Sequence, residues 1–186
     1  MRLLLVMLAL LFAAVARGDE KDLAKKLDDL NAQIKKSPDT PMPYYRRAQC
    51  LMALGRCEEG YQAAKEAMAV FVKSGAHLSW MLLESIDLER LQVDVHFNMG
   101  PQERNPPKDG IVRPLSFRVW SKGKERSLLA IIDFEIGMLQ GKPQTAALGQ
   151  QFADAHATFG MLPVDASYEL VRTKAIELIK RRHAKP

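Results

Sequence analysis

Small and apolar residues between residues 41 and 71 constrain the possible folds of this chain more than any other stretch. The segment reads PMPYYRRAQCLMALGRCEEGYQAAKEAMAVF. Apolar residues three and four apart give each half one face of a helix, and a glycine interrupts the pattern where a turn is needed. We therefore predict an antiparallel pair of helices, over residues 43–54 and 58–73, that turns at Gly55.

The offsets of six residues resemble the tetratricopeptide repeat (TPR), a helix-turn-helix unit of about 34 residues. These residues are Tyr44, Ala48, Leu51, Gly55, Ala64 and Ala67. The sequence differs from the repeat at Gly60, where the family has its most characteristic alanine, and at Val72, where it has a closing proline. The resemblance implies a role in binding proteins or peptides.

The resemblance also implies which side chains would contact a partner. The groove-facing positions of the family lie on the first helix and correspond here to Met42, Tyr45, Gln49, Met52 and Ala53, with Arg46 and Arg47 beside them. From this set we take as candidate partner-binding residues Tyr45, Arg46, Gln49 and Met52. The alternative is that Tyr45 and Met52 pack against a sheet formed by the second half of the chain.

Residues 1–18 have the pattern of a cleaved export signal. Arg2 precedes an uncharged apolar run from Leu3 to Ala16, and Ala16 and Gly18 are the small residues that a signal peptidase reads. The apolar run is shorter than the roughly 20 residues of a helix that spans a bilayer. We expect cleavage after Gly18, a periplasmic or secreted location, and no membrane span in the cleaved chain.

Composition and charge argue for an ordinary folded domain. The hydrophobic content is 47%, which is enough for a real core, and the net charge falls from +5 to +3 once Arg2 and Arg17 leave with the signal. Nucleic acid is not an expected partner of an exported protein. The basic end of the chain, residues 180–185, is interpreted as cations that complement the dipole of a final helix.

The two cysteines flank the predicted turn. Cys50 and Cys57 are the only cysteines, and an oxidising compartment allows such a pair to close into a disulfide. The alternative is that both are small buried residues that fill a tight helix pair. A metal site is not expected, because these two thiols supply too few ligands and the histidines are distant in sequence.

Helical periodicity extends to both sides of the repeat. Leu23, Leu27, Leu30 and Ile34 form one apolar stripe over residues 20–36, and Pro38 ends it. Residues 76–91 are apolar on several sides, which we interpret as a helix packed between two layers. The sequence therefore predicts a TPR-like helical region over residues 19–90.

The second half of the chain changes to a two-residue period. Residues 91–98 alternate strictly, and two further segments, around residues 115–120 and 126–139, flank a turn at residues 121–124. A turn at residues 140–143 leads to a possible third pairing in QTAALG, and residues 167–180 form a final amphipathic helix that Ser167 or Asp165 caps. We predict an α+β fold, in which residues 91–186 form an antiparallel sheet of three or four strands plus a C-terminal helix. This region packs with the TPR-like hairpins as one composite domain.

Three titratable residues are candidates for chemistry. Asp133 and Glu135 share one face of a strand, with Ser116 and Arg118 across the hairpin, and His156 lies in a segment that we interpret as a loop. Paired carboxylates can act as acid and base. They can equally form the solvated face of a sheet, with Arg118 as a cross-strand charge partner.

The chain lacks a recognisable nucleophile motif, a glycine-rich phosphate loop and metal-ligand spacing of histidines. We therefore expect no catalytic residue, no cofactor and no metal. The leading hypothesis is an exported, non-catalytic TPR-like protein that mediates protein-protein interaction. The alternative is a small hydrolase or ligand-binding module that uses the loop around His156 with Asp133 and Glu135. Convergence of these three residues in one pocket would favour the alternative.

Overall fold

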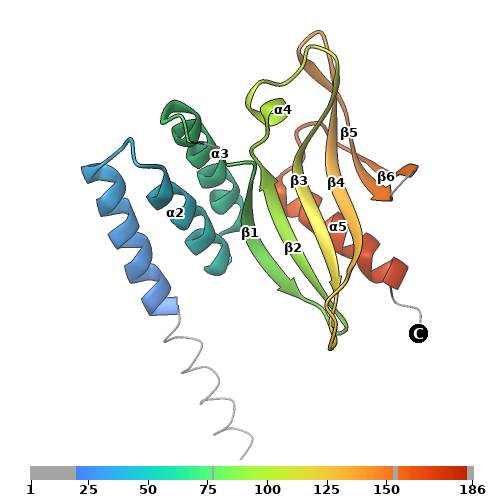
Figure 1. Ribbon diagram of the computed structural model, residues 1–186, viewed down its shortest axis with the longest axis horizontal. Coiled ribbons are helices and arrows are strands. Elements are labelled where there is room, and N and C mark those ends of the chain that lie inside the picture. Colours follow the sequence, from blue (N-terminus) through green and yellow to red (C-terminus); the bar gives the residue numbers. More distant parts are fainter. Residues whose placement is uncertain (1–19, 77, 153–154, 184–186) are drawn as a thin grey trace, which may run out of the picture.

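The computed structural model describes residues 20–76, 78–152 and 155–183, and their fold is α+β. Five helices and a six-stranded antiparallel sheet make up this part of the chain (Figure 1). The predicted export signal, residues 1–18, lies outside the described residues. Among the residues described, no helix has both the length and the apolar character needed to cross a membrane.

The N-terminal part consists of three helices, as the periodicity predicts. A first helix covers residues 20–36, and α2 (Pro41–Ala53) and α3 (Cys57–Lys73) form the expected pair around Gly55, which has a φ of 72°. Ala48 and Ala64 are completely buried and let α2 and α3 approach closely. A Cβ atom at Gly60 would lie 3.0 Å from Cγ of Met52, so glycine suits this close contact between the two helices.

Residues 76–91 do not form the predicted helix. They contain strand β1 (Trp80–Asp87), so the helical region ends at Lys73 and not at residue 90. Met81 and Leu83 are buried, and Ile86 packs on the core from a partly buried position. A short run of adjacent apolar residues cannot be assigned to strand or helix from its periodicity, and the register shift between Leu82 and Glu84 interrupts the two-residue alternation, which explains the wrong prediction.

The sheet is larger than the three or four strands predicted. After β1 come β2 (Leu91–Asn98), β3 (Gly110–Ser121), β4 (Leu128–Leu139), β5 (Lys142–Phe152) and β6 (Ala155–Leu162), paired in that order. A short helix, α4 (Pro101–Arg104), connects β2 to β3. The predicted hairpin of residues 115–139 is confirmed as β3 and β4, and the turn before β5 uses positive φ angles at Gln140 and Gly141.

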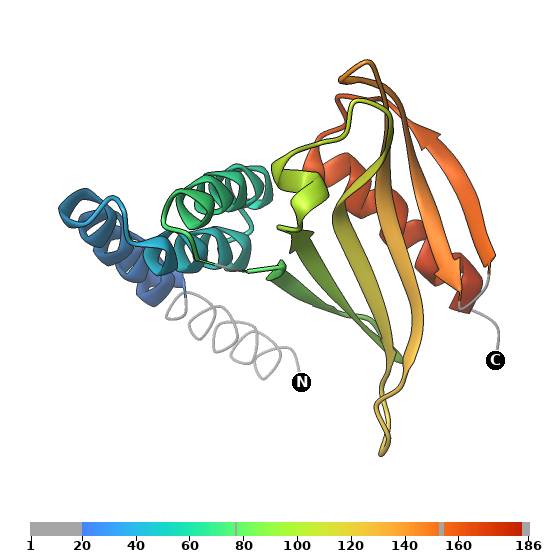
Figure 2. The ribbon, with the colours of Figure 1, turned by 45° about the horizontal axis from the view of Figure 1, so that its top comes forward.

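The final helix, α5 (Tyr168–His183), lies against one face of the sheet, which curves around it (Figure 2). Its start is capped as predicted, because the backbone N–H of Leu170 donates to Oγ of Ser167 at 3.3 Å. Alternate strand residues such as Val95 and Phe117 point toward α5 and are fully buried. The intervening residues are polar and point to the opposite face.

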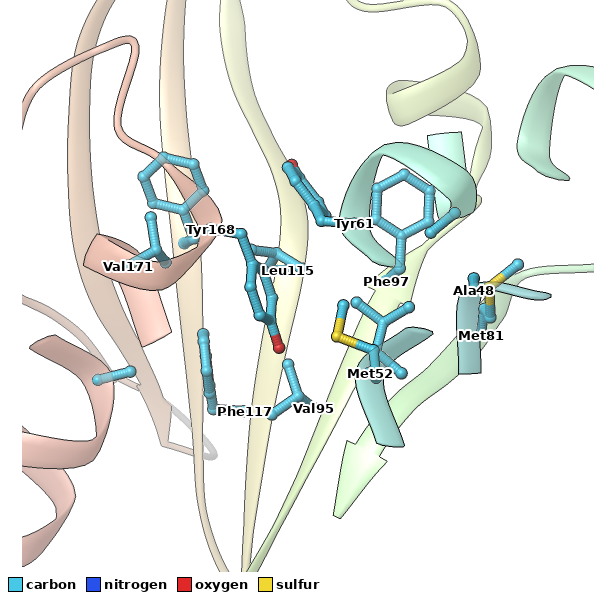
Figure 3. Close-up of a cluster of buried hydrophobic side chains, with 14 of the residues drawn as sticks. Ala48, Met52, Tyr61, Met81, Val95, Phe97, Leu115, Phe117, Tyr168 and Val171 are labelled. Carbon is cyan, nitrogen blue, oxygen red and sulfur yellow. The ribbon is translucent and has the colours of Figure 1, made fainter. Parts of the chain in front are cut away.

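The three parts of the fold meet at Tyr168, which has no exposed surface. Its ring stacks on that of Tyr61 from α3, with centroids 5.3 Å apart, and Tyr61 in turn contacts the edge of Phe97 from β2 (Figure 3). Its hydroxyl donates to Oε1 of Glu84 on β1 at 2.5 Å, and its backbone N–H donates to Oε2 of Glu58 on α3 at 2.9 Å. Helical hairpin, sheet and α5 therefore share one core, which includes residues of all three parts.

Both cysteines are free thiols, so the predicted disulfide is not formed. Sγ of Cys50 donates to the carbonyl oxygen of Leu23 in the first helix, at 3.2 Å. Cys57 instead lies near Glu84 and Arg172, and burial raises the pKa of both thiols. The two side chains serve different interfaces, and the alternative of a buried free thiol describes Cys50.

The contacts of Tyr168 predict that the halves of the protein unfold together. Replacement of this aromatic core residue, Tyr168→Ala, should cost about 4 kcal/mol, whereas Tyr168→Phe loses only the hydrogen bond to Glu84 and should cost about 1–2 kcal/mol. Each variant should unfold in a single urea transition, measured by far-UV circular dichroism and by tyrosine and tryptophan fluorescence. Two separated transitions, or a stably folded fragment of residues 19–75, would show that the helical part is self-sufficient.

Candidate functional site

The strongest concentration of buried polar groups lies on the sheet face that points away from α5. Ser116 on β3 stands opposite Asp133 on β4, and Glu135 follows on the same face two residues later. His156 comes from β6, two strands away from Glu135. The predicted loop around His156 is therefore a strand, and it brings the three candidate residues onto one face.

Glu135 is at the centre of this cluster and is only 6% exposed. Both of its carboxylate oxygens lie 2.9 Å from Nε2 of His156. Nε of Arg113 donates to Oε1 of Glu135 at 2.8 Å. A buried carboxylate is tolerated when it is paired and hydrogen-bonded on both oxygens, and these two partners meet that condition.

Asp133 is even more deeply buried, at 3% exposed. Oγ of Ser116 donates to its Oδ1 at 2.5 Å, and Nε of Arg113 lies 3.7 Å from its Oδ2. Burial raises the pKa of Asp133, and this effect exceeds the opposing influence of Ser116 and Arg113. The amide of Asn98 donates to Oγ of Ser116 at 3.2 Å and orients that hydroxyl.

Two sequence interpretations of this face are wrong. Asp133 and Glu135 do not form a solvated face, because the side chains around them exclude water. Arg118 is not their ion-pair partner, since its guanidinium lies over the ring of Trp80, 5.2 Å from the centroid. Arg113 takes that role, and sequence reasoning missed it because the pairing of β3 with β4 shifts register between Val112 and Leu115.

Gly149 explains how Glu135 reaches across an intervening strand to His156. It lies on β5, opposite Asp133 on one side and Thr158 on the other. A Cβ atom at this position would lie 2.6 Å from both Oε2 of Glu135 and Nε2 of His156. The two side chains therefore meet directly above the Gly149 backbone, and a glycine inside a strand is the sequence signal for such a close approach.

A second charged cluster on the same face is centred on Asp94. Asp94 accepts hydrogen bonds from Ser85, Gln92 and Arg126, at 2.6 to 2.9 Å. Beside it, burial and the nearby Arg118 lower the pKa of His96. Most charged side chains described on this face therefore interact with other side chains of the same face.

The predicted partner-binding residues on α2 face β1. The amide of Gln49 donates to the carbonyl oxygen of Leu82 and to the hydroxyl of Tyr45, each at 3.1 Å. Met52 is buried and Tyr45 packs partly on the core, whereas Arg46 is exposed. Gln49 makes the contact with the sheet, Met52 is buried in the shared core and approaches Gly60 on α3, and of the four candidates Arg46 is the one classed as exposed.

An open groove of about 480 Å³ lies on the other side of the helical part, between the first helix, α2 and α3. Its apolar lining is formed by Leu27, Leu51 and Ala63, and its polar lining by Asp28, Asn31, Arg47, Arg56, Glu58, Glu59, Gln62 and Glu66. Arg47 pairs with Glu66, and Arg56 pairs with Glu59. Nε of Arg47 is buried and has no hydrogen-bond partner among the residues that the structure describes.

Comparison of the chain with protein-family models, curated proteins and solved structures gives no match. The features that bear on function are therefore the buried cluster around Glu135 and the groove of the helical part. Within residues 20–76, 78–152 and 155–183, no group of three or more His, Cys, Asp or Glu side chains is arranged to hold a metal ion.

The close approach at Gly149 generates a prediction. A methyl group in Gly149→Ala should separate Glu135 from His156 and cost about 1–3 kcal/mol of stability through overpacking. The matched control is Gly160→Ala on β6, where a Cβ atom meets nothing within 4 Å. Urea denaturation of both variants measures the difference. Equal stability of the two would mean that the Glu135 and His156 side chains move apart without cost.

Proposed function

We propose that this protein is an exported, non-catalytic TPR-like protein that binds a segment of another protein. The observation that carries this proposal is the open groove between the first helix, α2 and α3. Its apolar lining suits aliphatic side chains of a bound segment, and the amide of Asn31 can hydrogen-bond to a peptide backbone. The proposed binding surface is thus on the opposite side of α2 from Gln49 and Met52.

The charges of the groove favour a segment of moderate positive charge. Its lining contains two arginines and four carboxylates, and both arginines are already paired with Glu59 and Glu66. Glu58 accepts from the N-terminus of α5 and from the amide of Gln62. Asp28 has no such partner among the described contacts, so it is the carboxylate available for a basic side chain.

The pairing of charges on the sheet supports a non-catalytic role. Glu135 is held by Arg113 and His156, and the hydroxyl of Ser116 donates a hydrogen bond to Asp133 instead of lying against a histidine. A general base or a nucleophile must be within reach of its substrate. In this arrangement each candidate group is directed at another side chain.

A second candidate function is supported by one observation, the convergence of Asp133, Glu135 and His156. His156 is 39% exposed and touches the buried Glu135, and Asp133 retains its proton to higher pH than usual. Such a set can bind a polar ligand or transfer protons. This function requires a substrate that displaces His156 or Arg113 from Glu135.

Site-specific cross-linking tests the groove. A photo-reactive amino acid at Asn31, on the groove, should give a discrete adduct with one partner protein in the exported fraction. The same amino acid at Lys122, in the β3–β4 turn, should give none. The charge-reversed background Asp28→Arg should reduce the Asn31 adduct about ten-fold if a basic side chain is bound. Adducts of equal yield at Asn31 and Lys122 would contradict the proposal.

The second candidate function requires that Asp133 keep its proton, and this requirement predicts a dependence of stability on pH. The folded state holds the Asp133 proton above the unfolded pKa of about 3.9, so this carboxyl group stabilises the fold most below about pH 4. Its contribution declines as pH rises through the folded pKa, at up to about 1.4 kcal/mol per pH unit. The stability of the natural protein relative to Asp133→Asn should therefore fall in urea titrations as the pH rises above about 4. A difference that rises with pH would contradict the protonated state.

A further inference from the structure

Strand β6 (Ala155–Leu162) forms an open edge of the sheet. It pairs with β5 on one side, and no further strand follows it in the sheet. Within the described residues, no backbone group of β6 is hydrogen-bonded to a segment other than β5. The opposite edge differs, because α2 covers β1 and Gln49 donates to the carbonyl oxygen of Leu82.

The composition of β6 leaves this edge unprotected. Its sequence, AHATFGML, contains no lysine, arginine, aspartate, glutamate or proline. Exposed edge strands usually carry such residues, which prevent pairing with other chains. Met161 is 67% exposed and adds an apolar side chain beside the unpaired backbone.

The last turn of α5 makes the surroundings of this edge basic. The guanidinium of Arg182 lies over the ring of Phe159 on β6, 3.7 Å from the centroid, and donates to the side-chain oxygen of Gln150 on β5. Lys180 and Arg181 precede it and are exposed. The end of α5 lies beside β5 and β6 in Figure 2.

We propose that β6 accepts an extended, acidic segment of a partner protein as a seventh strand. The backbone of the segment pairs with the open edge, and carboxylate side chains along it meet the cations of the last turn of α5. This surface is separate from the helical groove. It is formed by other elements, so a partner bound in the groove neither requires nor excludes it.

Charge complementarity favours an acidic segment over a second copy of this chain. β6 of a second copy contains no aspartate or glutamate, so it offers no opposite charge to Lys180, Arg181 and Arg182. An acidic strand meets the same cations with favourable sign.

The test uses two blocked synthetic peptides of about eight residues, which is the length of β6. Threonine alternates with glutamate in one peptide and with lysine in the other. Heteronuclear NMR of the whole protein follows the backbone amides of residues 155–162 while each peptide is added. We expect the glutamate peptide to shift these amides and to bind at least about ten-fold more tightly than the lysine peptide. Methylation of alternate backbone nitrogens of the peptide should abolish binding, because it removes donors from the strand pairing.

Variants of α5 test the charge contribution. The double reversal Lys180→Glu and Arg181→Glu should weaken the glutamate peptide at least five-fold, and added salt should do the same to the natural protein. The matched control, Lys25→Glu and Lys35→Glu on the exposed side of the first helix, should leave binding unchanged. Equal binding of both peptides, or no shift of the β6 amides at millimolar peptide, would overturn the proposal. Dimerisation through β6, seen by sedimentation and by amide protection of residues 155–162, would assign the edge to a second copy instead.

Discussion

The partly buried carboxylate of Glu84 fixes how the parts of this protein sit together. A register shift between Leu82 and Glu84 turns this side chain toward α5 and away from the polar face of the sheet. There it accepts from the hydroxyl of Tyr168 and from both nitrogens of the Arg172 fork, at 2.5 to 3.0 Å. The pairing with Tyr168 and Arg172 offsets the cost of removing this charge from water, and it joins α5 to β1 at a defined position.

The position of β1 determines which surfaces remain free. β1 contacts two helices. Its Glu84 accepts from Tyr168 on α5, and the carbonyl oxygen of its Leu82 accepts from Gln49 on α2, so helices cover this edge of the sheet. The same contact occupies the face of α2 that a repeat protein would use for a ligand. The remaining surfaces are the groove on the far side of the helical hairpin and the open edge at β6.

Periodicity in the sequence predicts the elements that have one buried face. The first helix, α2, α3, α5 and strands β2 to β4 all have such a face, and their positions follow from it. β1 has adjacent apolar residues and a register shift between Leu82 and Glu84, and β6 is rich in small residues, so neither has a decisive period. The partner of Glu135 could not be predicted because a register shift in β3 brings Arg113 to it. By contrast, the close approach at Gly149 is indicated in the sequence, because a glycine within a strand is typical of such a contact.

The buried cluster around Glu135 and the two proposed binding surfaces differ in whether existing contacts must break before a ligand binds. At Glu135, a substrate must first displace His156 or Arg113, and either change leaves a buried carboxylate with one hydrogen-bond partner fewer, which is unfavourable. A segment bound in the groove or along β6 meets surfaces whose apolar side chains and backbone groups are already exposed. Binding there requires no internal ion pair to break. Interaction with another protein is therefore the function that this arrangement of charges opposes least.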